Sequence, residues 1–316
     1  MITCSPAQNL KEVTIMKNVL FVENKYYVTS NDYGVKFVNT IDKSVEVFPF
    51  EDIEWLIFCH KNSYFSNRLI QTCLENNVGI MFCDNKMTPL TLFVSETRHN
   101  DRLTRLKEQI DLSTRTKNRL WRKIVISKIL NQAEVIKNNC GECETYQNLI
   151  KISKDVLEGD YNNRESYAAK LYFSKLFGKR FNRGRYTDDI NAGLNYGYAI
   201  LRAAIKRSMA IHGLEGSLGI NHHSIENSYN LADDIIEPFR PMIDEFVYTS
   251  IYESQSTFDK TVKREFYTIL LKTCIIDNRV LSINDSIEVF INSLIRCISK
   301  NNSTKLLLPK MKEFGE

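Results

Sequence analysis

The stretch IEWLIFCHKNSYFSNRLIQTCLENNVGIMFC, residues 53–83, indicates how the first part of the chain folds. Its two ends, WLIFC at 55–59 and VGIMFC at 78–83, are uninterrupted apolar runs, which are typical of strands buried on both faces. Between them, SNRLIQTCLENN has apolar residues at helical spacing and an Asn-rich end, which predicts a short helix. The stretch therefore predicts part of a compact sheet domain that ends near Phe93.

The sequence before this stretch also predicts strands. Short runs rich in Val, Phe and Tyr are separated by the turn-forming segments NK, NDYG and DKS: VLFVE, YYVTS, GVKFVNT and VEVFPF. Side chains of these types fit the pleated, half-buried surface of a sheet. The first third of the chain is therefore predicted to be β.

The hydrophobic period changes from about residue 101 onward. Apolar residues now recur at the spacing of amphipathic helices, in two stripes: Leu103, Leu106 and Ile110, then Leu120, Ile124, Ser127 and Leu130. No convincing strand follows. We therefore predict an α+β protein, in which an extension at 1–15 precedes a small β-sheet or β-sandwich domain at 16–97 and a larger all-α domain at 98–316.

The composition excludes several classes of protein. A length of 316 residues is enough for two domains of roughly 150 residues each, and 43% apolar with 25% charged residues is typical of a folded soluble protein. No apolar run approaches the roughly 18 residues of a membrane helix, and residues 1–15 lack the basic start and apolar block of a signal peptide.

The eight cysteines are scattered, so we expect no disulfide framework and a reduced, cytoplasmic location. Cys140 and Cys143 have the spacing of a zinc or redox pair, but no second pair accompanies them and their role stays open.

Positive charge is concentrated in the helical part, although the whole chain carries only +4. Residues 98–140 hold eleven Lys and Arg against four Asp and Glu, and residues 170–207 hold nine against two, so each stretch has a net charge of +7. Polyphosphate suits such a surface because each neutralised phosphate releases condensed counterions. The pattern favours a nucleic-acid partner, while a solvated helix face would explain either stretch alone.

The densest group of residues that could take part in catalysis or metal binding is at 219–241, GINHHSIENSYNLADDIIEPFRP. Asn230 is expected to cap a helix that begins at the next residue. The buried stripe of this helix is predicted to be Leu231, Ile235, Phe239 and Met242.

The same segment carries an acidic pair and two histidines. Asp234 and Glu237 are three residues apart and share a face away from the buried stripe, and Asp233 would serve nearly as well as Asp234. Like charges on adjacent turns repel unless a cation or water lies between them. Together with His222 or His223, the pair would suit Mg²⁺ or Mn²⁺, and Mn²⁺ accepts nitrogen more readily. A solvated acidic face is the other interpretation.

Glu165, in NNRESYAAKLYF, is a second candidate whose local pattern has a purely structural explanation. With Asn162 as the cap, Glu165 lies close to the position of the acid in a capping box. Nothing in the neighbouring sequence makes Glu165 catalytic.

Three segments together resemble the CRISPR-associated protein one family, the integrases of CRISPR adaptation. The family's Glu-x-x-Ala-Ala segment ending in Tyr-Phe is matched by Glu165, Ala168, Ala169, Tyr172 and Phe173. Its Asp-x-x-Asn-x-x-Leu-x-x-Gly-Tyr segment is approximated by DDINAGLNYGYAIL, with Asn191, Asn195 and Tyr198. Its Gly-x-x-His segment, followed by Leu-x-x-Asp-x-x-Glu-x-Phe-Arg-Pro, is matched by Gly219, His222, Leu231, Asp234, Glu237, Phe239, Arg240 and Pro241. The resemblance extends from Met16 over nearly the whole chain and includes members from single-effector (type II) systems.

The resemblance implies that Glu165, His222 and Glu237 bind Mg²⁺ or Mn²⁺, with Asp234 as a supporting carboxylate. The implied reaction is attack by the 3′-hydroxyl of a short DNA fragment on a phosphodiester of a CRISPR repeat. Basic side chains would hold the double-stranded DNA of the spacer precursor and the repeat, and we expect this of Arg180, Arg183, Arg185 and Arg240. The resemblance also implies a homodimer formed through the β-rich domain. Two such dimers would be bridged by a dimer of the small companion, CRISPR-associated protein two, in a heterohexamer.

Two other functions stay open at this stage. A metal-dependent nuclease acting on branched or single-stranded DNA would use the same residues with water as the nucleophile. A non-catalytic DNA-binding scaffold would have the same basic helices and leave the acids merely solvated.

Overall fold

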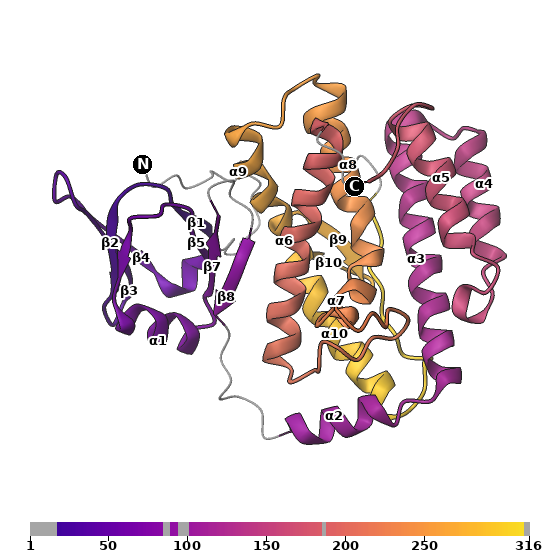
Figure 1. The fold of residues 1–316 in the computed structure, drawn as a ribbon, viewed down its shortest axis with the longest axis horizontal. Helices are drawn as coiled ribbons and strands as arrows, with labels where there is room; N and C mark the ends of the chain where they lie inside the picture. The colour runs from indigo at the N-terminus through magenta and orange to yellow at the C-terminus, as the bar shows by residue number, and fades with distance from the viewer. Residues whose placement is uncertain (1–17, 85–88, 94–100, 185–187, 313–316) are drawn as a thin grey trace. The chain divides into compact units, whose positions relative to one another are not determined.

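The computed structural model describes residues 18–84, 89–93, 101–184 and 188–312. The chain divides into two compact units, residues 1–98 and residues 99–316. Strands dominate the first unit and helices the second (Figure 1), so the predicted α+β fold class is confirmed.

Two four-stranded sheets form the first unit. One has the strand order β1-β5-β7-β8, in which the first three strands are parallel and β8 is antiparallel: β1 Asn18–Val22, β5 Ile53–Phe58, β7 Gly79–Cys83 and β8 Pro89–Phe93. The other has the order β4-β3-β2-β6: β4 Val45–Pro49, β3 Gly34–Asn39, β2 Tyr26–Ser30 and β6 Tyr64–Phe65. Helix α1, Asn67–Glu75, begins at Ser66, whose side chain accepts a hydrogen bond from Leu69 N.

The core of this unit lies between the two sheets and α1. It contains alternate residues of the strands together with Leu69 and Cys73 of the helix. The apolar runs predicted as strands buried on both faces are β5 and β7, and Trp55 to Ile57 are fully buried. Gly79 allows the close pairing of these strands, because a Cβ atom there would lie 2.5 Å from the Trp55 ring.

Nine α-helices and several short helical turns make up most of the second unit as far as the structure describes it. The bounds of the α-helices are α2 Arg102–Ile110, α3 Thr114–Cys140, α4 Glu144–Lys154, α5 Arg164–Leu176, α6 Asp189–Ile211, α7 Asn230–Ile235, α8 Arg240–Val247, α9 Lys260–Thr268 and α10 Ile283–Ser299. Short 3-10 turns are η2, Glu158–Asp160, η3, Glu237–Phe239, and η5, Ile269–Leu271. The 27-residue α3 packs against α4, α5, η3 and α8, while α6 packs against α7, α8, α9 and α10 (Figure 1). None of the helices described has the length and apolar character needed to cross a membrane.

A β-hairpin corrects the expectation that no strand follows residue 101. Strands β9, Thr273–Ile276, and β10, Arg279–Ser282, pair antiparallel through a two-residue loop. Both loop residues, Asp277 and Asn278, have positive φ angles, which Asp and Asn tolerate better than most residues. The Asp-Asn pair between two short apolar runs was therefore a hairpin signal.

The two predicted helical stripes differ in burial. Leu120 and Ile124 of α3 are fully buried, whereas Leu103 and Ile110 of α2 are more than 60% exposed. The periodicity in α2 therefore predicted the helix correctly but not a buried face.

Candidate active site

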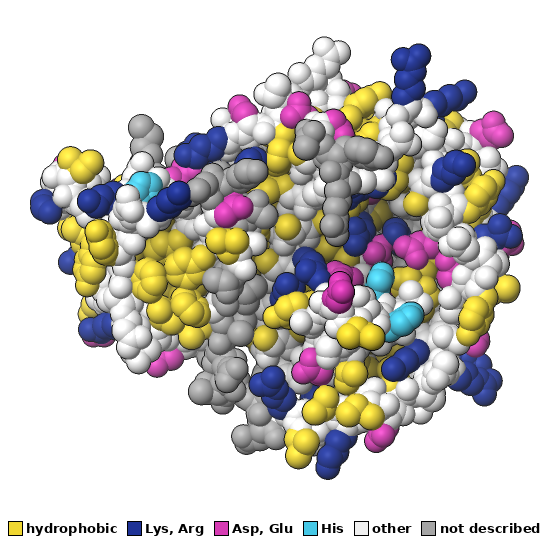
Figure 2. All heavy atoms as spheres, viewed as in Figure 1, with side chains coloured by type: hydrophobic (Ala, Val, Ile, Leu, Met, Phe, Trp, Pro, Cys, Tyr) yellow, Lys and Arg dark blue, Asp and Glu magenta, His cyan; other side chains and the backbone are white. Residues whose placement is uncertain are grey.

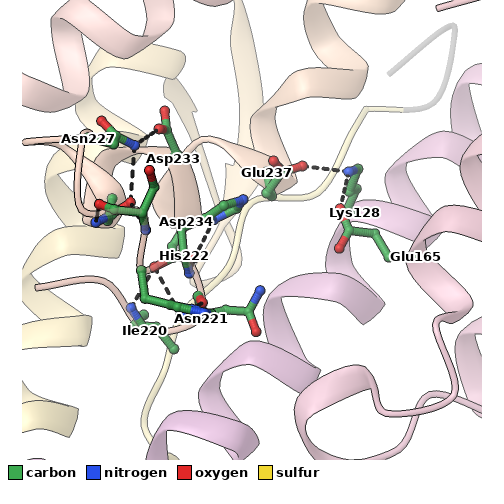
Figure 3. Close-up of polar contacts among 12 residues, drawn as sticks. Lys128, Glu165, Ile220, Asn221, His222, Asn227, Asp233, Asp234 and Glu237 are labelled. Atoms are coloured by element: carbon green, nitrogen blue, oxygen red, sulfur yellow. Dashed lines mark hydrogen bonds and ion pairs between the residues drawn. The ribbon is translucent and has the colours of Figure 1, made fainter.

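A single lysine joins two glutamates that come from different parts of the helical unit. Lys128, in the middle of α3, places its Nζ 2.6 Å from Oε1 of Glu165 on α5 and 2.5 Å from Oε2 of Glu237 on η3 (Figure 3). The two carboxylate oxygens can therefore be no farther apart than the sum of these distances. The Lys128 and Glu237 side chains are only 11% and 6% exposed, so little water screens this contact.

Glu237 has a second cationic partner. Arg240, at the start of α8, places Nε 3.0 Å from Glu237 Oε1. Burial alone would raise the pKa of the Glu237 carboxyl, but the charges of Arg240 and Lys128 outweigh burial and lower that pKa. Burial would likewise lower the pKa of Lys128, but Glu237 and Glu165 raise it. Both shifts favour the charged forms of Glu237 and Lys128.

Helix α3 also holds the η3 turn in place. Asn131, one turn beyond Lys128, is buried and donates hydrogen bonds to the carbonyl oxygens of Pro238 at 2.8 Å and Pro309 at 3.0 Å. Because Pro238 directly follows Glu237, this contact positions the glutamate backbone next to the helix that carries Lys128.

The start of α5 positions Glu165, but not through the predicted cap. Asp160 accepts hydrogen bonds from Arg164 N at 2.8 Å and from Glu165 N at 3.1 Å. Asn162 instead donates to Asp155 O, and Asn163 precedes the helix with a positive φ angle. The capping-box explanation of Glu165 is therefore wrong, and its side chain reaches Lys128.

His222 lies on a loop that wraps around the carboxylate of Asp234. Backbone N–H groups of Ile220, Asn221 and His222 donate to this carboxylate at 2.5, 3.2 and 3.1 Å. The ring of His222 contacts the same group, with Nδ1 2.8 Å from Oδ1 of Asp234 (Figure 3). Gly219 permits the wrap, because a Cβ atom there would lie 2.1 Å from His222 O.

The Asp234 contact fixes the orientation of the imidazole. The hydrogen bond to Asp234 raises the pKa of His222 and uses Nδ1, so a ligand would be met by Nε2. The ring also packs edge-on against Trp121 of α3, with 5.7 Å between ring centroids. Figure 2 shows histidine and acidic side chains close together on the visible face of the helical unit.

The neighbouring polar residues have other tasks. Asp233 pairs with Arg202 of α6 at 2.6 Å and accepts a hydrogen bond from Asn227, so Asp234 rather than Asp233 lies with His222. Asn230 does not cap α7, which corrects the prediction. Its amide instead donates to Ser217 O and Ser224 O and ties the ends of the His222 loop together. The predicted buried stripe, from Leu231 to Met242, is buried.

Two of the predicted DNA-binding arginines lie around one tyrosine. The guanidinium of Arg240 is 4.5 Å from the centre of the Tyr198 ring, and that of Arg183 is 5.2 Å from it. The Tyr198 hydroxyl donates a hydrogen bond to Asp244, whose carboxyl pKa is raised by burial to about 6. This network connects Arg183 to the ion pair of Arg240 and Glu237.

The other two arginines give less information. Arg180 is exposed. Arg185 lies outside the described residues.

The donor set suits a hard divalent cation, although a lysine stands at its centre. Among the described residues, no three His, Cys, Asp or Glu side chains lie together closely enough to hold a metal ion as they stand. Two carboxylates nevertheless converge on one positive charge, and an oriented imidazole faces the same region (Figure 3). Carboxylate oxygens with one imidazole nitrogen are ligands that Mg²⁺ and especially Mn²⁺ accept. The residues therefore fit such an ion if the ammonium of Lys128 moves aside.

Lys128 and Asn131 are the site residues that sequence reasoning missed. The signal was present, because both are polar residues on a helix whose neighbouring positions Ile124, Ile129 and Val135 are fully buried. A lysine among buried positions of a long helix needs a partner of opposite charge.

A small β unit followed by a larger helical unit is a two-domain fold class that solved structures share. The fold is similar to that of a casposase bound to its integration product, with a TM-score of 0.72, 20% identity and 92% of each chain covered. It is also similar to a chain of a Cas6-RT-Cas1–Cas2 complex, with a TM-score of 0.68 and 15% identity over 98% of this chain and 37% of that one.

Sequence comparison identifies the family within this class. The family model described as CRISPR associated protein Cas1 matches residues 20–276. A CRISPR-associated endonuclease Cas1 from Neisseria meningitidis serogroup C (strain 8013) is 32% identical over 271 residues, which are 85% of this chain and 88% of the relative. The chain therefore belongs to the Cas1 family, as its three motifs predicted.

Proposed function

We propose that this protein is a divalent-metal-dependent DNA integrase and endonuclease that inserts short DNA fragments into a CRISPR array. The observation that carries the proposal is the convergence of Glu165 and Glu237, from separate elements, on one cation beside the oriented His222. Membership of the Cas1 family and the endonuclease name of the Neisseria relative support it. The proposed location is the cytoplasm.

Glu165, Glu237 and the Nε2 atom of His222 would hold the ion, Mg²⁺ or Mn²⁺. When bound, it would lower the pKa of the attacking 3′-hydroxyl and stabilise charge on the reacting phosphate. In the joining step, the 3′-oxygen of the fragment forms a bond to a repeat phosphorus, and the bond from that phosphorus to the departing 3′-oxygen breaks. Asp234 holds the His222 ring in the orientation that keeps Nε2 toward the ligand. Arg240 holds the Glu237 carboxylate.

DNA would be gripped through its phosphates by basic side chains of the helical unit. Arg183 and Arg240 share the Tyr198 ring next to Glu237, so a phosphate entering the site would meet both guanidinium groups. Arg180, which is exposed, and Arg185, which lies outside the described residues, are also proposed to contact the DNA. Such contacts position double-stranded DNA and carry little sequence information.

The β unit offers an apolar surface for the proposed homodimer. Outward-facing residues of β6, β2, β3 and β4 form one row across the second sheet in register: Tyr64, Tyr27, Val38 and Val45. Tyr64, Tyr27 and Val45 are 57%, 43% and 51% exposed, and Figure 2 shows apolar side chains gathered on the visible face of this unit. Burying such a row stabilises association. Light scattering tests the dimer, and a purely monomeric protein at micromolar concentration would contradict it.

A further proposed partner is the small companion Cas2, two copies of which would join two such dimers in a heterohexamer. The support is the similarity of this fold to a chain of a Cas6-RT-Cas1–Cas2 complex.

The decisive experiment is a joining assay of short duplex DNA into a supercoiled plasmid that carries the repeat, with Cas2 present and with Mg²⁺, Mn²⁺ or EDTA. We expect joined product only with a divalent ion, and a loss of at least about 10³-fold for Glu165→Gln and His222→Ala, because each removes a proposed metal ligand. Glu158→Gln is the matched control, since Glu158 pairs with Arg119 at an exposed position. DNA binding should persist in all three variants.

The products separate the proposal from its alternatives. Free 5′-phosphate ends without joined strands would favour a nuclease that uses water. DNA binding with no reaction under any metal would favour a scaffold. Full joining by Glu165→Gln or His222→Ala would refute the assignment of the site.

A further inference from the structure

Lys128 lies at the point where the two site glutamates meet. Its Nζ is within 2.6 Å of both carboxylates, and its side chain is 11% exposed. An ammonium group is a compact point charge with several donors at the end of a flexible stem. It therefore satisfies two carboxylates at once and can also swing away without a change in the helix.

The ion pairs explain why the glutamates face each other. Two carboxylates this close repel strongly in a poorly hydrated site unless a cation lies between them. Arg240 pairs with Glu237, whereas the ion pair of Glu165 is with Lys128, so Arg240 does not bridge the two acids. The bridging charge belongs to Lys128.

The ammonium and a divalent ion compete for the same oxygens. With Lys128 and Arg240 in place, the charges of Glu165 and Glu237 are already balanced. A divalent ion added to this arrangement would leave an excess of +2 in a largely buried site, next to the ammonium. Withdrawal of Lys128 lowers the excess to +1, which one DNA phosphate then balances.

We propose that Lys128 is an internal counter-ion of the Cas1 site: it keeps Glu165 and Glu237 facing each other in the metal-free protein and is displaced when the divalent ion binds. Lys128 is thus a positioning residue that also lowers the metal affinity of the site. The inference rests on the proposed function, because it takes the ion to bind between these glutamates.

The test is Mn²⁺ binding to the full-length protein, measured by isothermal titration calorimetry and by the loss of the free-ion electron paramagnetic resonance signal. Lys128→Met removes the charge and keeps an apolar stem of similar length. We expect its Kd for Mn²⁺ to be at least about tenfold lower than that of the wild type, because the ion no longer has to displace a resident cation. Lys128→Arg, which retains a cation, should return the affinity toward the wild-type value.

Lys137→Gln is the matched control on the same helix. Lys137 pairs with Glu142 at 3.7 Å, and this variant removes one positive charge from α3 without touching the site. Its Kd for Mn²⁺ should equal that of the wild type, so a general effect of net charge can be recognised.

Thermal unfolding provides a second measurement. Lys128→Met should melt at a lower temperature than the wild type in EDTA, and Mn²⁺ should raise its Tm by more than it raises that of the wild type, because the ion replaces the missing charge.

The outcomes are distinct. Unchanged or weaker Mn²⁺ binding by Lys128→Met overturns the counter-ion role and leaves the proposed function standing, and so does a variant that Mn²⁺ cannot stabilise. If the wild-type protein and Lys128→Met both fail to bind Mn²⁺, the metal site itself is refuted.

Discussion

Asp234 and Glu237 are three residues apart and both buried, but the protein holds their carboxylates in opposite ways. Asp234 is held by residues that are close to it in the sequence. The backbone N–H groups of residues 220–222 and the imidazole of His222 all form hydrogen bonds with its carboxylate. Glu237 depends on Lys128, more than a hundred residues earlier, and on Arg240. The first arrangement, the histidine half (residues 219–234), can form when its own loop folds. The second, the carboxylate half (Lys128, Glu165, Glu237 and Arg240), exists only when α3, α5 and η3 are packed together.

The difference assigns separate tasks to the two halves. The histidine half uses neutral backbone donors, so its geometry needs no outside cation. The carboxylate half is held by charges and can rearrange when another cation competes for its oxygens. If the proposed function holds, the histidine half would present a fixed ligand, and the carboxylate half would be the part that responds to metal.

The largest effect is expected for Glu237→Ala in the metal-free protein. The truncation leaves Lys128 and Arg240 without their shared partner, and breaking a buried ion cluster costs about 3–5 kcal/mol of unfolding free energy. Urea unfolding in EDTA measures this value. Glu158→Ala, at an exposed ion pair, should cost less than about 1 kcal/mol. Equal losses in the two variants would mean that the carboxylate half is not held by its charges.

The pH dependence of stability sharpens the comparison through Asp244. This residue accepts a hydrogen bond from Tyr198, whose ring lies against the guanidinium of Arg240. Burial raises the pKa of Asp244 from 3.8 to about 6, so the folded protein binds this proton more tightly than the unfolded chain. The stabilisation from Asp244 is fully present below pH 3.8 and is lost as the pH rises through about 6. Asp244→Asn keeps the group neutral and retains an oxygen that accepts from Tyr198.

Asp244→Asn should therefore be more stable than the wild type at pH 8, by up to about 3 kcal/mol, with the advantage shrinking toward pH 4. Denaturant unfolding at pH 4, 6 and 8 measures the difference. Asp277→Asn, at an exposed hairpin residue, controls for the loss of one charge. An advantage that does not change with pH would show that burial of the carboxylate is not its cause.

The smallest effect is expected for Asp234→Asn, which alters the histidine half. An amide offers one acceptor oxygen where the carboxylate uses two, so the His222 loop loses part of its support. We expect a loss of about 10–100-fold in joining rate, because residues that orient a metal-binding histidine have effects of this size. Asp233→Asn, one position earlier, removes a contact to Arg202 instead and should join DNA at nearly the wild-type rate. Similar rates for the two variants would contradict the role of Asp234.

Much of the fold could be predicted because its signals are local. The strands β1 to β5 and β7 correspond to short apolar or aromatic runs, and α3 corresponds to its hydrophobic stripe. The stripe from Leu231 to Met242 is buried for the same reason. The exposure of Leu103 and Ile110 could not be predicted, since periodicity shows which side of a helix is apolar and not whether another element covers that side.

The polar contacts were harder to predict than the elements. Asn230 and Asn162 both had the right residue type for a helix cap, but Asn230 donates to Ser217 O in the His222 loop and Asn162 to Asp155 O at the end of α4. Asp160 took the role expected of Asn162 because Gly159 and Asn163, with positive φ angles, turn the chain so that Asp160 faces the start of α5. Short polar side chains bond to whichever backbone group the turn places within reach.

The sequence by itself determined the order of the two units, the positions of most helices and strands, and the residue types available for the site. It also identified the family, because three motifs occurred in the right order. Only the tertiary structure decided which charges meet: that Lys128 lies between Glu165 and Glu237, and that Asp234 holds His222 while Asp233 does not. The physical reason is that hydrophobic period depends on near neighbours along the chain, whereas the energy of a charge depends on distances in space and on burial, which arise when separate elements pack together.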